Sequence, residues 1–156
     1  MDQVPAAPPG EPALPGDSSV QREAEILLID ALGRELGVGL SKNRRKTVHG
    51  SVVKFDGLSV DPPVLVEAWA HQGKPLSAQK YKVMTDALKL VWAESTFFPD
   101  CARKILVLAD DDAAAHFRGT SWMAAALLHL GIEVRVVPLP DEIRERIRLA
   151  QVRQFC

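Results

Sequence analysis

The chain has 156 residues, of which 47% are hydrophobic and 25% charged, as is typical of an ordinary folded domain. Its formal net charge of −1 excludes a strong overall field for nucleic acid, so a basic binding surface has to be local. The sequence contains no long apolar run, no secretory-signal pattern, and two cysteines, Cys101 and Cys156, that match neither a zinc site nor a disulfide framework. We therefore expect a cytoplasmic protein with free thiols and no membrane partner.

The N-terminal segment differs in composition from the rest of the chain. Residues 1–18 are rich in proline and poor in large apolar side chains, which predicts a disordered leader. Residues 19–156 are then expected to form a single α/β domain. Its first element is a helix from about 20 to 37, with a serine cap at Ser18 and Ser19 and glycines at its end.

Two strands are expected next. The basic segment Lys42–Lys46 (KNRRK) leads into β-branched residues that predict a strand from Val48 to Phe55. Turn residues at Asp56-Gly57 and at Asp61-Pro62-Pro63 return the chain as the apolar strand Val64–Ala70. The two strands should pair in antiparallel fashion.

The remaining elements alternate between helices and strands. A helix over 77–95 is expected to bury Tyr81, Met84, Leu88, Val91 and Trp92. Strands at 104–109 and 132–137 and helices at 121–130 and 141–153 follow. The resulting order is α-β-β-α-β-α-β-α, which predicts an α/β fold with a mixed sheet flanked by helices.

One carboxylate stands out because of its surroundings. Glu67 lies among Leu65, Val66, Ala68 and Trp69 in the second apolar strand. Burying an unpaired charge is costly, so such a group usually becomes protonated, pairs with a cation or binds a metal. Glu67 is therefore a candidate site residue.

Asp56, Glu67 and the order of elements together resemble the PD-(D/E)xK superfamily of restriction-endonuclease-like nucleases over residues 20 to 110. In that superfamily an acidic residue near a strand and a (D/E)xK motif on the next strand hold one or two divalent ions beside the scissile phosphate. The resemblance assigns the first acid to Asp56, with Asp61 as second choice, and the second acid to Glu67. It implies Mg²⁺ or Mn²⁺ as cofactor, DNA as substrate, and a homodimer as one arrangement suited to cutting two strands.

The resemblance is incomplete at the motif lysine, because Trp69 stands two residues after Glu67. A cation would have to come from elsewhere, and we favour Lys82 on the second helix, with Lys80 and Lys74 as alternatives. Gln79, Lys80, His71, Arg44 and Arg45 are candidate contacts to nucleic acid. Each has a structural alternative, since exposed lysines are common on helices and a histidine often serves only as a hydrogen-bonding group.

Two other interpretations stay open. Glu67 with Asp110 and Asp112, which follow a predicted strand, resembles a Toprim domain, the metal-dependent module of primases and topoisomerases; Ala68 stands where that family has glycine. Alternatively, a nuclease fold without its lysine serves as a catalytically degenerate module that binds nucleic acid or takes part in assembly.

Overall fold

The structure is a computed structural model, and it describes residues 17–99 and 101–153. The described elements are, in chain order, α1 (Asp17–Leu36), β1 (Ser41–Lys46), β2 (Val52–Val60), β3 (Pro63–Trp69), α2 (Ser77–Phe97), β4 (Arg103–Leu108), α3 (Asp111–Arg118), α4 (Trp122–His129), β5 (Ile132–Val136) and α5 (Asp141–Arg153). None of the described helices is long and apolar enough to cross a bilayer.

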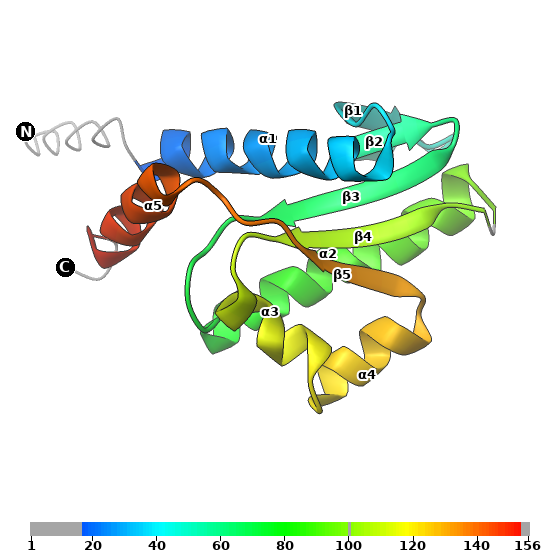
Figure 1. Ribbon diagram of the computed structural model, residues 1–156. Helices are drawn as coiled ribbons and strands as arrows, with labels where there is room; N and C mark the ends of the chain where they lie inside the picture. The colour runs from blue at the N-terminus through cyan, green and yellow to red at the C-terminus, as the bar shows by residue number, and fades with distance from the viewer. Residues whose placement is uncertain (1–16, 100, 154–156) are drawn as a thin grey trace, which may run out of the picture.

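The strands form one mixed sheet between two layers of helices. The sheet has five strands in the order β1-β2-β3-β4-β5; β1, β2 and β3 pair antiparallel, and β3, β4 and β5 pair parallel. Helices α1 and α5 cover one face, and α2, α3 and α4 cover the other (Figure 1). The expected α/β fold with a mixed sheet and flanking helices is confirmed.

The central strands are apolar because both of their faces are covered. Along β3, Val64, Val66 and Ala68 pack in the layer of α1 and α5, while Leu65 and Trp69 pack against α2 and α3. Every residue from Val64 to Ala70 is buried. Glu67 is the one charged residue of this segment, so its carboxylate is enclosed by the fold.

The expected order of elements is contained in the observed one, which has one further strand and one further helix. The basic segment expected to lead into a strand is itself β1, and Asp111–Arg118 forms α3. Helix α1 begins at Asp17; residues 1–16 of the expected leader lie outside the described part. All six residues of the edge strand β1 are polar and carry no apolar alternation, which is why this strand was not expected.

Helix α2 buries a different face from the one expected. Its buried residues are Val83, Ala87, Leu90 and Ala93, whereas Tyr81 and Leu88 are 63% and 67% exposed. Small alanines allow the helix to approach the sheet closely, so the face with the largest side chains is not the face in the core. Exposed apolar groups therefore remain on the outer side of α2.

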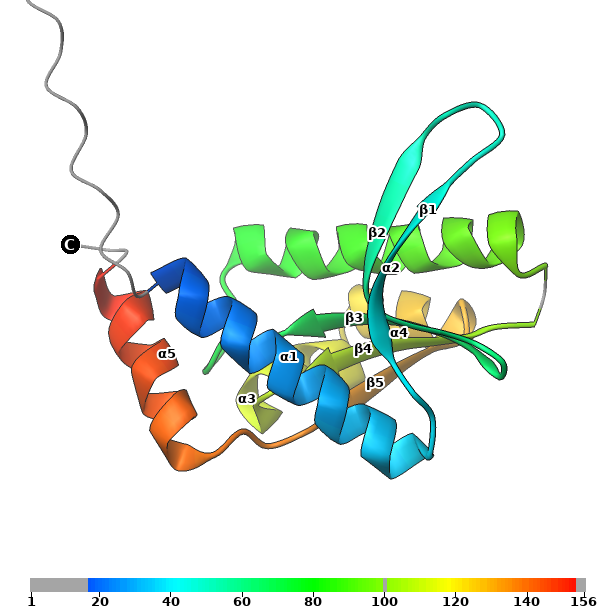
Figure 2. The same cartoon turned by 90° about the horizontal axis from the view of Figure 1, so that it is seen from above.

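The expected turn at Asp56-Gly57 is instead an irregularity inside β2. Ser41 pairs with Leu58 and Asn43 with Phe55, so β2 has one more residue than β1 over this interval. Such a bulge bends a strand and redirects its side chains, and the chain turns only after Val60, at Asp61 and Pro62. Beyond the bulge the β1–β2 hairpin swings away from β3 (Figure 2).

The bulge depends on the absence of a side chain at Gly57. A Cβ at this position would lie 3.1 Å from Ile29 Cδ1 and 3.4 Å from Val66 Cβ. We predict that Gly57→Val lowers the free energy of unfolding by about 1–3 kcal/mol, because a larger side chain overpacks this contact. Urea denaturation measures the change.

Gly39→Val is the matched control, since nothing lies within 4 Å of its Cβ position. Gly57→Val should cost less free energy of unfolding in an Ile29→Ala background than in the native chain, because the side chain that it would overpack has been shortened. Equal stability of the Gly57 and Gly39 variants would contradict the overpacking argument.

Candidate functional site

Asp56 and Glu67 are brought together where β2 separates from β3. The β2–β3 pairing places Gly57 opposite Val66, and the next residues in that register are Asp56 and Glu67. The Asp56 Oδ2 atom accepts a hydrogen bond of 2.9 Å from the Ala68 amide, so a side chain takes the place of a strand partner. The carboxylate of Asp56 is thereby held at the opening of the sheet.

Glu67 lies beneath this opening and is only 4% exposed. The Nζ atom of Lys89, from α2, makes an ion-pair contact with Glu67 Oε1 and also donates a hydrogen bond of 2.8 Å to the Lys54 carbonyl. Helix α2 thus supplies a cation directly to the buried carboxylate.

Burial raises the pKa of Glu67 to about 9, and hydrogen bonding to Asp56 together with its negative charge adds to the rise. The positive charge of Lys89 lowers the pKa but does not offset the other two causes. At neutral pH Glu67 therefore holds a proton next to the Asp56 carboxylate. A buried carboxyl group whose pKa is raised by burial and by a neighbouring carboxylate is typical of sites that bind a cation or transfer protons.

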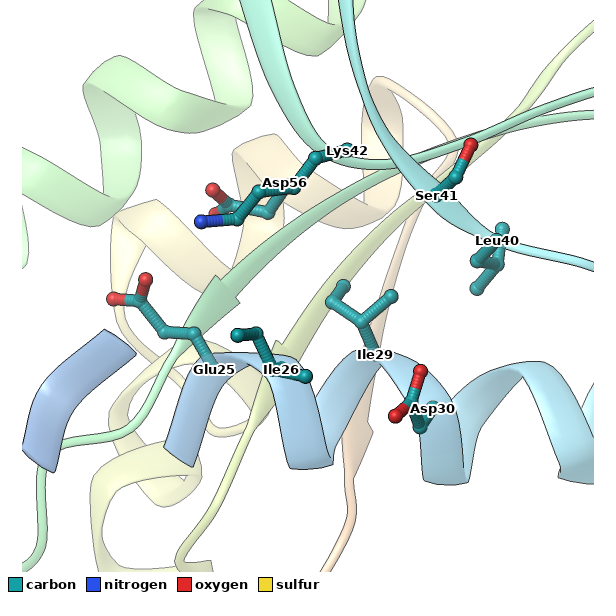
Figure 3. A pocket seen from close by; sticks show the side chains of 8 residues that line it. All are labelled: Glu25, Ile26, Ile29, Asp30, Leu40, Ser41, Lys42 and Asp56. Carbon is teal, nitrogen blue, oxygen red and sulfur yellow. The ribbon is translucent and has the colours of Figure 1, made fainter. Parts of the chain in front are cut away.

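Further charged groups surround this pair from both helical layers. Burial and the negative charge of Asp56 raise the pKa of Glu25, on α1, and Lys82 and Lys42 oppose that rise. Glu25, Asp56 and Lys42 line a cavity of about 140 Å³, and Figure 3 shows the Glu25 carboxylate directed toward Asp56 and Lys42. We call Glu25, Asp56, Glu67 and Lys89 the acidic cluster.

Lys82, the cation favoured from the sequence, lies on the same helix as Lys89 but about two turns before it. Its Nζ atom is 3.8 Å from Asp86, and its side chain is 62% exposed. Burial raises the pKa of Asp86, and the charges of Lys82 and Lys89 counteract that effect. Lys82 contributes to the field of the cluster, while Lys89 makes the contact with Glu67. The sequence offered no signal to separate two lysines seven residues apart on one helix.

Trp69, at the position of the motif lysine, belongs to the hydrophobic core and is 3% exposed. Its ring stacks on His71 with centroids 4.8 Å apart. Burial and the charge of Lys82 lower the pKa of His71, so this imidazole is neutral at neutral pH. Gln79 Nε2 lies 3.4 Å from His71 Nδ1, and its Oε1 accepts from the Leu76 amide at the start of α2.

Asp110 and Asp112, the acids of the alternative Toprim interpretation, do not belong to the acidic cluster. Leu106 lies opposite Glu67 in the parallel β3–β4 pairing, and Asp110 follows after β4 has ended. Asp110 Oδ2 accepts a hydrogen bond of 2.7 Å from the Gly73 amide, and Oδ1 lies 3.8 Å from Arg144. Asp112 is exposed in the first turn of α3. The structure therefore gives Asp110 a role in anchoring the loop after β3.

The remaining candidates lie apart from the carboxylate pair. Lys74 is exposed in the loop before α2, and Lys80 acts electrostatically on His116 rather than on the cluster. Arg44 and Arg45 lie on β1, with Arg45 placed over the Phe98 ring. Lys74 and Lys80 therefore lie near the start of α2, and Arg44 and Arg45 lie on the hairpin.

The oxygen atoms present suit a hard cation with few protein ligands. Among the described residues no group of three or more His, Cys, Asp or Glu side chains is close enough to hold a metal. Mg²⁺ commonly uses one or two carboxylates and completes its shell with water and substrate phosphate. Asp56 and Glu67 fit such a two-carboxylate site, which Glu67 would join in its ionised form.

Comparison with known proteins matched two solved structures. The crystal structure of a repair endonuclease from Pyrococcus abyssi is 21% identical, with 76% of this chain and 47% of that chain covered and a TM-score of 0.43. The apo form of EndoMS is 20% identical, with 75% and 47% covered and a TM-score of 0.43. The chain thus spans less than half of either structure's length. No family model and no curated protein matches it.

The pKa of Glu67 predicts a pH dependence of stability. A carboxyl group whose pKa is raised on folding binds more protons in the folded state, so stability falls as pH rises from about 4.5 to about 9. Glu67→Gln removes this dependence. Relative to the native chain the variant should gain up to about 1.4 kcal/mol per pH unit within that window.

Urea denaturation at pH 6 and pH 8.5 measures the gain. Glu133→Gln is the control, because the Arg103 guanidinium holds the pKa of Glu133 below its usual range and no proton is exchanged in the window. If the free energies of unfolding of Glu67→Gln and the native chain differed by the same amount at pH 6 and pH 8.5, the raised pKa of Glu67 would be contradicted.

Proposed function

We propose that this chain is a metal-dependent nuclease of the PD-(D/E)xK type that hydrolyses phosphodiester bonds in DNA. The observation that carries the proposal is the meeting of Asp56, Glu67 and Lys89 at the point where β2 leaves β3. Two carboxylates on adjacent strands and one lysine are the functional groups of that superfamily's site. Here the lysine comes from α2, because Trp69 fills the core at the motif position.

Asp56 and Glu67 would be the ligands of a Mg²⁺ or Mn²⁺ ion. Such an ion supplies Lewis-acid stabilisation of a phosphate oxygen and lowers the pKa of a bound water. Asp56 is already oriented by the Ala68 amide, so little side-chain entropy is lost when it binds. Glu67 gives up the proton it holds at neutral pH as it becomes a ligand.

Lys89 has the position to stabilise negative charge at the reacting phosphate. Its ammonium contacts Glu67, and the Lys54 carbonyl fixes its direction. If Glu67 binds the metal ion, the Lys89 ammonium would remain as a positive charge near the reacting phosphate. Glu25, on the opposite helical layer, can accept a hydrogen bond from water at the cluster, because its carboxylate faces the shared cavity.

Cleavage should depend on both carboxylates. Asp56→Asn and Glu67→Gln keep the size of each side chain but remove its charge, and each should lower Mg²⁺- or Mn²⁺-dependent DNA hydrolysis by at least about 100-fold. The assay follows cleavage of labelled linear and branched DNA substrates at a fixed metal concentration. Asp112→Asn, at an exposed acid outside the cluster, should cut at the native rate.

Undiminished cleavage in both carboxylate variants would contradict the proposal. Loss of cleavage in Glu67→Gln and Asp112→Asn, with native cleavage in Asp56→Asn, would favour the Toprim interpretation. A native chain that binds DNA but cuts none of these substrates with either ion would instead support the degenerate binding module.

The two lysines of α2 can be separated in the same assay. Lys89→Met should lower cleavage by about 100-fold or more, since it removes the only α2 cation in contact with Glu67 among the described residues. Lys82→Met is the matched control on the same helix, with an expected loss of less than about tenfold through its longer-range field. The reverse ranking would assign the motif lysine's role to Lys82.

A further inference from the structure

The β1–β2 hairpin concentrates positive charge in a chain that is otherwise nearly neutral. Residues 41–55 carry five lysines and arginines and no aspartate or glutamate, although the whole chain has a net charge of −1. Figure 2 shows this hairpin projecting well beyond the rest of the sheet. A projecting basic element without acidic residues is suited to contact a polyanion.

A hollow of about 560 Å³ lies between the end of the hairpin and the C-terminal half of α2. Hairpin residues Lys46, Thr47, His49 and Ser51 form one side, and Trp92 and Phe97 of α2 form part of the other. Cationic and hydroxyl groups therefore face aromatic rings across a space that is comparable with small-ligand pockets, which hold about 300–1,000 Å³.

Trp92 is unusual because a large aromatic ring is left partly in solvent. It is 40% exposed, and its ring packs edge-to-face on Phe97 with centroids 5.9 Å apart. The edge contact fixes the ring's orientation. A fixed, accessible indole next to cationic groups has the character of a platform on which an unpaired base can stack.

Arg45 precedes Lys46 on β1 and lies against Phe98, which follows Phe97 of the hollow in the chain. Its guanidinium carbon lies 5.6 Å from the centre of the Phe98 ring, and its Nε atom is buried without a hydrogen-bond partner among the described residues. A buried guanidinium nitrogen normally has an acceptor. A phosphate oxygen reaching the groove would supply one.

We propose that the groove between the β1–β2 hairpin and α2 binds a single-stranded segment of nucleic acid, with an unpaired base stacked on Trp92 and phosphates held by Lys46, His49 and Arg45. A paired duplex exposes base edges but no base faces, so the indole favours a single strand. The groove is distinct from the acidic cluster, and it adds to the proposed nuclease the class of substrate that it would hold.

The hairpin contributes residues to both regions. Lys42, at the base of β1, lines the cavity that contains Asp56 and Glu25. The carbonyl of Lys54, on β2, accepts the hydrogen bond from Lys89. A strand that followed the hairpin from the Trp92 groove toward Lys42 and Lys54 would approach the acidic cluster.

Binding is measured by fluorescence anisotropy on the full chain, with EDTA present so that cleavage plays no part. The probes are a labelled mixed-sequence single-stranded DNA, the same sequence as a blunt duplex, and the matching single-stranded RNA. We expect the single-stranded DNA to bind at least about tenfold more tightly than the duplex, with strong weakening by salt. Equal affinity for RNA would show that the groove does not distinguish the sugars.

Trp92→Ala should weaken single-strand binding by about tenfold, and Trp92→Phe, which keeps an aromatic face next to Phe97, should retain most of it. Trp122→Ala is the matched control, since that tryptophan is 67% exposed on α4. Circular dichroism verifies that each variant is folded. Native-like binding by Trp92→Ala, or duplex bound as tightly as single strand, would overturn the inference.

Asp56→Asn and Glu67→Gln separate this inference from the proposed function. If neither the native chain nor these variants cut DNA but Trp92-dependent binding persists, the nuclease proposal fails and the groove stands. If the native chain cuts DNA while Trp92→Ala binds single strands normally, the groove assignment fails and the nuclease stands.

Discussion

The hydrogen bond from the Ala68 amide to Asp56 determines where the sheet opens, and the candidate site depends on it. An amide that would pair with β2 in a regular ladder pairs with a carboxylate, and the bulge at Asp56-Gly57 turns the hairpin away. Groups from α1 and α2 then approach the same point from opposite faces of the sheet. A regular strand here would keep the two helical layers apart.

Enclosure by the fold explains the chemistry of the cluster. The apolar strands β3 and β4 exclude water from Glu67, so its charged form is costly and its pKa rises to about 9. Lys89 lowers that cost only in part. The result is a carboxyl group held neutral until a stronger cation arrives, adjacent to a second carboxylate that the backbone has already oriented. Metal binding needs Glu67 in its ionised form, whereas burial in the fold favours the protonated form. Such a conflict is common at functional sites.

The sequence predicted most helices well because their apolar periodicity and terminal glycines are local signals. Glu67 was also identifiable, since a carboxylate inside an apolar strand has few structural explanations. The strand β1 and the exposed face of α2 were missed, because their positions depend on tertiary pairing and on close packing of alanines. Lys89 was not singled out for a related reason: which lysine of a helix meets a given strand residue is decided by how the helix is rotated on the sheet.

Calorimetric titration of Mn²⁺ into the native chain, Asp56→Asn and Glu67→Gln tests the central claim most directly, because it measures metal binding apart from any substrate. We expect one saturable site on the native chain, with affinity reduced at least about tenfold in each variant and increasing with pH in the native chain as Glu67 ionises. Binding that is the same in all three proteins, or absent from the native chain at pH 8.5 with and without DNA, would contradict a metal site at Asp56 and Glu67.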